Sequence, residues 1–176
     1  MNKVCIYILL CTTFLNAQNQ KNQIYLNADD IIPALFSSNA SAYNLGYRRQ
    51  IKENKHLRIG LKYFQETENE FALGVKPGLD VAFNTSKKWI FYYGVDLALN
   101  YTDNLQSERT YYEATLIPFF RAEYVISDRF SISTEPGLFL KLLTIKDNDN
   151  SPIDNSNSIV SSGIGDLGII NINFSF

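Results

Sequence analysis

The sequence predicts an all-β fold, an eight-stranded antiparallel up-and-down β-barrel. Apolar and polar residues alternate along most of the 176-residue chain, a pattern typical of strands that have one apolar and one polar face. The chain contains 11 Tyr and 12 Phe, and both residue types favour strands. It also ends on an alternating strand, residues 170–176, whose exposed edge would invite aggregation. A closed barrel protects that edge by pairing the last strand with the first.

Residues 1–17 are interpreted as a cleaved secretion signal, and residues 18–176 as a single barrel domain. An apolar stretch precedes the small residue Ala17, after which we expect cleavage. A membrane anchor is the alternative, but the stretch is short for a spanning helix. Lipid attachment at Cys11 is a second alternative, but Leu10 is a poor match to the small residue that precedes a lipid-modified cysteine. Cys5 and Cys11 both lie in the signal, so the mature chain would have no disulfide and no cysteine-ligated metal site.

Polar turns separate the predicted strands. The first strand, residues 24–36, is irregular because two aspartates and Pro33 interrupt its apolar pattern. The other seven strands alternate regularly and cover residues 43–51, 57–63, 71–83, 89–101, 112–126, 130–142 and 159–176. Turns are expected at residues 37–41, 52–55, 65–69, 84–87 and 127–129, and longer loops at 102–109 and 147–158. Including the first strand gives eight, and single-chain bacterial barrels have even strand numbers.

The polar faces are predicted to line the interior, and the apolar faces to meet lipid, which makes the barrel transmembrane. Glycine and alanine are mixed with charges on the polar faces, and small residues suit the narrow interior of eight strands. Tight turns fall at one rim and longer loops at the other, the asymmetry of outer-membrane barrels. Aromatic residues at the strand ends predict two girdles at the membrane interfaces. The outer girdle would comprise Tyr43, Tyr63, Phe71, Tyr101 and Tyr112, and the inner girdle Phe83, Trp89, Phe91, Tyr124, Phe130 and Phe176. A soluble lipocalin-like barrel, with its apolar face inside, is the alternative.

Charged residues on the polar faces are predicted to pair inside the lumen. The bases are Arg48, Arg58, Lys62, Lys76, Arg121 and Lys141, and the acids are Asp80, Asp96, Glu113, Glu123 and Glu135. Buried charges are costly unless they are paired, so this near-balanced set indicates an ion-pair network that fills the lumen. The positions of the tight turns place Lys76 opposite Asp96 and Arg121 opposite Glu135. A selective pore is the alternative interpretation of the same charges.

The alternation over residues 24–176 and the terminal Phe176 resemble small bacterial outer-membrane proteins of the OmpA-barrel or OmpX type. The resemblance implies an integral outer-membrane protein, monomeric, with both termini in the periplasm and with lipid and lipopolysaccharide around it. It also implies that the C-terminal strand, through Phe176, is the signal that the barrel-assembly machinery reads. Because the resemblance rests on a pattern rather than on a motif, it transfers no functional residues.

Enzymatic activity is not expected from the sequence. Some eight-stranded outer-membrane barrels, the lipid A palmitoyltransferases and deacylases, use a catalytic histidine with a serine. The only histidine in the sequence, His56, is expected in a solvated periplasmic turn. There it could not activate a serine on the outer side of the membrane. The loop at residues 147–154 does not match a calcium-binding EF-hand, and no cofactor is expected. The net charge of −2 does not indicate a nucleic-acid partner.

The leading interpretation is a structural or surface-interaction role that presents the loops at 102–109 and 147–158 to an extracellular partner. A minor channel for small solutes is the second interpretation, and a lipid A-modifying enzyme is the third.

Overall fold

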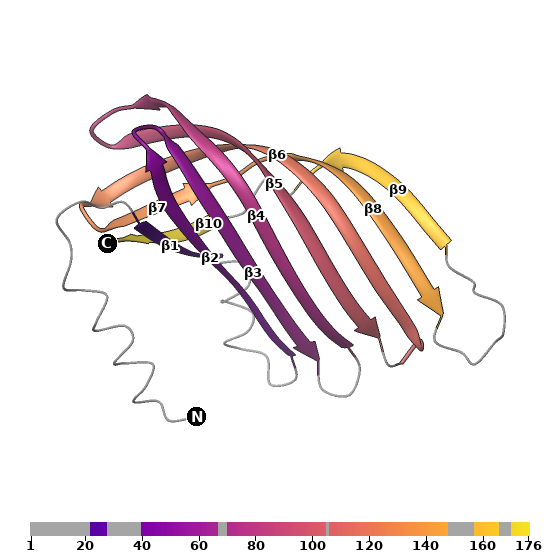
Figure 1. Cartoon of the computed structure of the whole chain (residues 1–176). Helices are drawn as coiled ribbons and strands as arrows, with labels where there is room; N and C mark the ends of the chain where they lie inside the picture. Colours follow the sequence, from indigo (N-terminus) through magenta and orange to yellow (C-terminus); the bar gives the residue numbers. More distant parts are fainter. Residues whose placement is uncertain (1–21, 28–39, 67–69, 105, 148–156, 166–169) are drawn as a thin grey trace.

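A computed structural model describes residues 22–27, 40–66, 70–104, 106–147, 157–165 and 170–176 (Figure 1). The predicted signal and residues 28–36 of the predicted first strand lie outside these residues. All regular structure in the described part is β-strand, arranged in one antiparallel sheet of ten strands. The strands are β1 (Asn22–Asn27), β2 (Ala40–Lys52), β3 (Lys55–Glu66), β4 (Glu70–Thr85), β5 (Trp89–Asn104), β6 (Arg109–Ser127), β7 (Phe130–Thr134), β8 (Leu138–Asp147), β9 (Asn157–Ile164) and β10 (Ile170–Ser175).

Eight of these strands form a closed ring, which confirms the predicted eight-stranded antiparallel barrel. The order around the ring is β1, β2, β3, β4, β5, β6, β7 and β10, after which β10 pairs with β1 again. At this closure Ile24 lies across from Phe174. The backbone N–H of Phe176 donates a hydrogen bond of 2.9 Å to the carbonyl oxygen of Asn22. The last strand therefore leaves no free edge in this part of the sheet.

The prediction of two continuous final strands was wrong, because each consists of two shorter strands. Residues 135–137 separate β7 from β8, and β6 pairs with both of them. Pro136 has no backbone N–H to donate to a ladder, although its carbonyl oxygen accepts a 2.9 Å bond from the Phe120 N–H. The second predicted strand is divided into β9, which pairs with β8, and β10, which pairs with β7 and β1. As a result, β8 and β9 extend the sheet beyond the closed ring (Figure 1).

Half of the predicted loop at residues 102–109 is strand. Thr102 pairs with Tyr111, and Asn104 pairs with Arg109, so only residues 105–108 separate β5 from β6. The prediction failed because backbone pairing continues where the apolar alternation stops. Most of the other predicted loop, residues 148–156, lies outside the described part of the chain. The tight turns occur near their predicted positions, at residues 53–54, 86–88 and 128–129.

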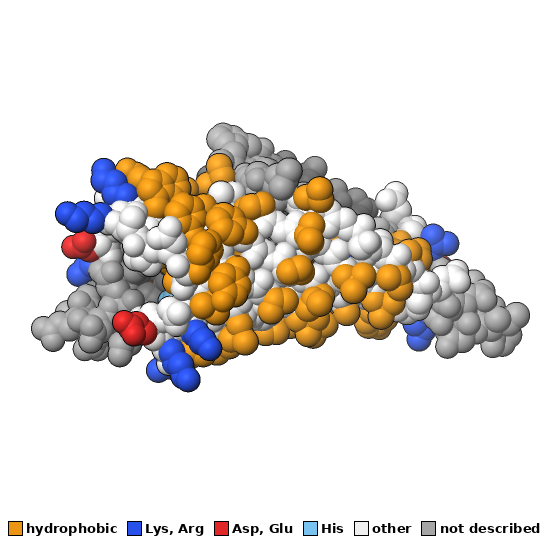
Figure 2. Space-filling view, turned by 90° about the horizontal axis from the view of Figure 1, so that it is seen from above, with side chains coloured by type: hydrophobic (Ala, Val, Ile, Leu, Met, Phe, Trp, Pro, Cys, Tyr) orange, Lys and Arg blue, Asp and Glu red, His pale blue; other side chains and the backbone are white. Residues whose placement is uncertain are grey.

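The barrel is polar inside and apolar outside. The most deeply buried large side chains are charged or polar: Arg58, Arg121, Asn173, Asp80 and Asp96. Large apolar side chains that are more than a third exposed occur on every strand of the closed ring, from Leu26 in β1 to Ile172 in β10. Figure 2 shows them as a band across the visible face, with charged side chains gathered at its two ends. The interior is therefore lined by the polar face of each strand.

Interior glycines leave room for large neighbouring side chains, and two of them provide a matched test. A Cβ added to Gly94 would lie 2.5 Å from Phe119 Cζ and 2.9 Å from Asp80 Cβ, and would also meet the backbone oxygen of Leu79. A Cβ added to Gly60 would lie 3.3 Å from Cβ and Cε of Lys76, so Lys76 would have to shift by a few tenths of an ångström.

We predict that Gly94→Ala lowers the free energy of unfolding by about 1–3 kcal/mol, because overpacking a tight interior forces rearrangement. Gly60→Ala should stay within about 0.5 kcal/mol of the wild type, because its neighbour can move aside. Urea unfolding followed by the fluorescence of the single tryptophan measures both values. If the two variants lost the same free energy of unfolding, steric overlap at Gly94 would not be the cause.

Candidate functional site: the lumen cluster

Charged side chains meet in the interior of the closed ring. We call these residues the lumen cluster: Arg48, Arg58, Lys76, Arg121, Asp80, Asp96, Glu123 and Glu135. They lie on the inward faces of β2 to β6 and in the break between β7 and β8. All except Lys76 are buried. Strand alternation accounts for their common direction, because every second side chain of each strand points inward.

Arg58 lies at the centre of the lumen cluster and contacts three carboxylates. Its Nη2 donates a 2.7 Å hydrogen bond to Oε2 of Glu135. Its Nε lies 3.3 Å from Oδ1 of Asp96, and its Nη1 lies 3.8 Å from Oδ2 of Asp80. The Arg58 side chain has no exposed surface, so these carboxylates take the place of water around its charge.

The remaining pairs extend the lumen cluster from this centre. Arg48 binds Asp80 through two hydrogen bonds, of 2.7 Å from Nε and 2.5 Å from Nη2. This two-point geometry is the strong arrangement for an arginine and a carboxylate. Arg121 lies 3.0 Å from Glu123 and 3.6 Å from Glu135. Lys76 lies 3.6 Å from Asp96, so four cations and four carboxylates balance in the lumen cluster.

Three interior aromatic rings and one amide complete the shell around the guanidinium groups. Arg58 lies 4.4 Å from the ring centroid of Phe119 and 5.2 Å from that of Tyr25, and Arg48 lies 4.2 Å from that of Tyr92. Such cation–π contacts stabilise desolvated cations. Gln23 of β1 accepts a 2.9 Å hydrogen bond from Arg121 and donates one of 2.9 Å to Glu123.

Sequence reasoning missed some members of this shell. Gln23 and Tyr25 alternate with the apolar Ile24 and Leu26, a signal that the irregular residues after Asn27 obscured. Phe119 is an apolar residue on the inward face of β6, as is Ile117, so hydrophobic patterning could not identify it as a lumen residue.

The two predicted opposite pairs lie close together, but the register of one differs from the prediction. Arg121 lies across from Glu135 in the register that pairs Ala122 with Thr134. Lys76, by contrast, is not opposite Asp96. Gly78 occupies that position, and the Lys76 amine reaches Asp96 diagonally. The register differs because the turn lies later in the chain than predicted and a bulge follows Ala82.

The other predicted lumen charges lie nearer the opposite end of the strands. Lys141 is 3.6 Å from Glu113, and both side chains are partly exposed. Lys62 has an exposed side chain.

The prediction that His56 is a solvated turn residue was wrong. A turn of only two residues precedes β3, so His56 already occupies an inward strand position two residues before Arg58. Its side chain is 12% exposed, and its Nδ1 lies 2.9 Å from both Asp80 Oδ1 and Arg48 Nη2. Its ring meets the ring of Tyr92 edge-on at 5.8 Å. The histidine therefore belongs to the charged interior.

Two interior cavities lie on either side of the lumen cluster. The larger, of about 840 Å³, is bordered by Lys76, Asp96 and Glu135 of the lumen cluster. The smaller, of about 370 Å³, is bordered by Arg48 and Glu123. Arg58, Arg121 and Asp80 border neither cavity. These three side chains therefore occupy the interior between the two cavities.

Four of the six aromatic residues predicted for the inner girdle, Phe83, Trp89, Phe91 and Tyr124, form a continuous group of rings on the outer surface. Trp89 stacks on Phe91 at 6.1 Å and contacts Tyr124 at 5.0 Å, and Phe83 lies 6.3 Å from Phe91. The ring of Phe176 stacks on Phe174.

Near the other rim, Tyr63 contacts Phe71 at 6.1 Å, and Tyr101 contacts Tyr112 at 5.5 Å. The side chain of Tyr43 lies outside the described part, although its backbone pairs with Tyr63.

No protein-family model matches the chain, and no curated protein is significantly similar to it. Among the described residues, no helix is long and apolar enough to cross a membrane. The same residues contain no group of three or more His, Cys, Asp or Glu side chains placed to hold a metal ion.

Proposed function

We propose that this protein is a small integral β-barrel of the bacterial outer membrane, with a structural or surface-interaction role and no enzymatic activity. The inside-out distribution of side chains carries the proposal. A water-soluble barrel would leave its apolar outer face in contact with water, and exposed apolar surfaces of this extent mark protein or membrane contacts. A membrane barrel has a lipid-facing apolar band and a polar interior, and the described strands have both.

In this proposal the lumen cluster blocks the lumen, so the barrel is not an open pore. Eight strands leave an interior just wide enough for side chains to fill. The guanidinium groups of Arg58 and Arg121, with the carboxylate of Asp80, would fill the interior between the cavities, since all three are buried and border neither cavity. Lipid and lipopolysaccharide would surround the barrel, and the ends of the strands away from the tight turns would face an extracellular partner. The assembly machinery would recognise the strand that ends at Phe176.

Migration in gels and extraction from membranes test the membrane location. An outer-membrane barrel stays folded in cold detergent and migrates differently after boiling, and it remains with membranes washed in alkaline carbonate. A soluble barrel would be released by the carbonate wash and would show no shift on heating. If the carbonate wash released the protein, and if the protein migrated identically before and after boiling, the proposal would be refuted. An unchanged mass profile of lipid A between wild-type and deletion strains would support a non-enzymatic role, and a changed profile would refute it.

A minor channel for small solutes is the second candidate, and the two cavities favour it. They lie on either side of the lumen cluster. Conductance across a planar bilayer separates the two functions. A closed barrel should show no steady single-channel steps, whereas regular steps from the wild-type protein would favour the channel.

A further inference from the structure

Lys62 stands apart from the other lumen bases. Each of the other five lies within 4 Å of a carboxylate, whereas Lys62 has no ion pair within the part of the chain that the structure describes. Its side chain borders the larger cavity from β3. Lys62 is therefore an exposed base at the cavity that has no carboxylate partner among the described residues.

Asn171 supplies a second unused donor to the same cavity. This β10 residue is only 3% exposed, and its Nδ2 has no hydrogen-bond partner among the described residues. A buried amide without a partner is unusual and costs free energy, because the group has lost its contacts with water. Lys62 and Asn171 are both donors, so the group that would satisfy them is an acceptor with negative charge.

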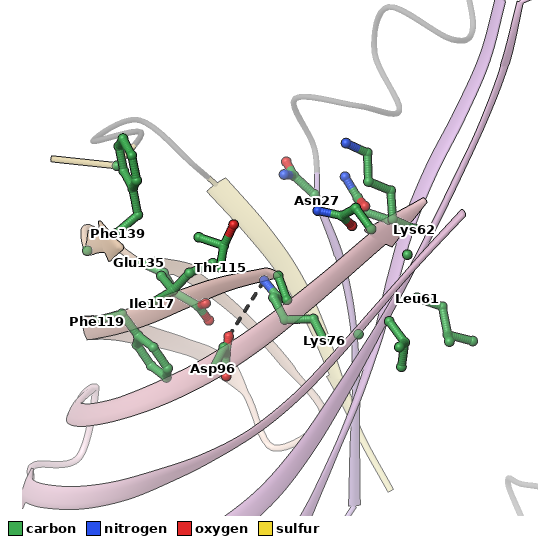
Figure 3. A pocket seen from close by; sticks show the side chains of 18 of the residues that line it. Asn27, Leu61, Lys62, Lys76, Asp96, Thr115, Ile117, Phe119, Glu135 and Phe139 are labelled. Atoms are coloured by element: carbon green, nitrogen blue, oxygen red, sulfur yellow. Dashed lines mark ion pairs between the residues drawn. The ribbon is translucent and has the colours of Figure 1, made fainter. Parts of the chain in front are cut away.

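An apolar wall forms another side of the cavity. Ile117, Phe119 and Phe139 contribute side chains from β6 and β8, as Figure 3 shows, while Lys62 lies on the opposite side. The volume of about 840 Å³ is within the range of small-molecule sites. An inorganic anion would leave the apolar wall unused. A cation would find that each of the cavity's three carboxylates already lies within ion-pair distance of a base: Asp96 of Lys76, Glu113 of Lys141 and Glu135 of Arg58.

We propose that this cavity binds a small organic monoanion, a carboxylate attached to an apolar ring or short chain. The carboxylate would accept hydrogen bonds from Lys62 and Asn171, and the apolar body would lie against Phe119 and Phe139. The site does not depend on where the protein resides, so it would stand even if the membrane location were refuted.

Benzoate is a suitable probe, with benzyl alcohol and benzylamine as neutral and cationic controls of similar size. Binding to the purified full chain in nonionic detergent is measured by titration calorimetry and ligand-observed NMR, with detergent alone as the blank. We expect benzoate to bind at least tenfold more tightly than benzyl alcohol, and benzylamine to show no binding. Lys62→Met should weaken benzoate binding by about tenfold, because a charge-assisted hydrogen bond is lost.

Two variants sharpen the test. Asn171→Asp is nearly the same shape but places a carboxylate where the donor was, and it should weaken benzoate binding at least as much as Lys62→Met. Lys55→Met removes an exposed lysine at the start of the same strand, away from the cavity, and should leave binding unchanged. Equal losses for Lys55→Met and Lys62→Met would overturn the proposal. So would binding of benzylamine as tight as that of benzoate, or no benzoate binding to the wild type.

Discussion

Replacing Arg58 with methionine lowers the free energy of unfolding by about 3–5 kcal/mol, the cost of removing one partner from a buried ion pair. The guanidinium contacts Asp80, Asp96 and Glu135, and the Arg58 side chain is fully buried. Methionine fills a similar volume but leaves the lumen cluster with an excess of buried negative charge. The loss of unfolding free energy therefore comes mainly from the carboxylates that are left unpaired, and less from the missing contacts of arginine.

Urea titration of the detergent-solubilised barrel, read as the fraction that keeps the unboiled gel migration, measures this loss. Arg49→Met is the matched control, because Arg49 is the next residue and its side chain is exposed on the outer face. The control should change the free energy of unfolding by no more than about 0.5 kcal/mol. The double variant Arg58→Met with Glu135→Gln should lose less than the sum of the two single losses, since the residues are coupled. A loss below about 1 kcal/mol in Arg58→Met would show that the lumen cluster is solvated rather than buried.

Deleting Phe176 lowers the amount of barrel in the outer membrane severalfold but destabilises the folded barrel only modestly. The deletion removes two backbone hydrogen bonds with Asn22, of 2.9 and 3.3 Å, and the ring contact with Phe174. Two such bonds contribute about 1–3 kcal/mol together. The larger effect is expected on assembly, since the terminal aromatic residue is the proposed recognition signal. Immunoblots of outer-membrane fractions and urea unfolding of the purified variant separate the two effects.

Phe176→Tyr is the control for the deletion, because it keeps the chain length and an aromatic ring at the terminus. Its level in the outer membrane should be close to that of the wild type. Wild-type levels of the truncated protein would refute the role of Phe176 in assembly. A truncated protein that is absent from the membrane and also fails to fold when purified would assign the effect to barrel closure instead.

The sequence by itself determined most of the strands, their two faces and the number of strands in the ring. A period of two is a local property, so it identifies inward positions such as Arg48, Arg58 and Asp80 without knowledge of their neighbours. The tight turns were equally local and therefore predictable. Two features could not be predicted from alternation. Residues 102–104 continue β5 although their side chains are polar. Pro136 interrupts a strand whose apolar alternation continues on both sides of it.

The tertiary structure decided which charges meet. A difference of two residues in the register of β4 and β5 moved Lys76 away from the position opposite Asp96. The contact between Arg58 and Glu135 joins β3 to the break between β7 and β8, neither of which neighbours β3 in the sheet. Closure of the ring brings β1 against β10, which places Gln23 beside Glu123 and leaves Asn171 facing the larger cavity. Alternation specifies the direction of a side chain, but partners across a lumen depend on the curvature, register and closure of the whole sheet.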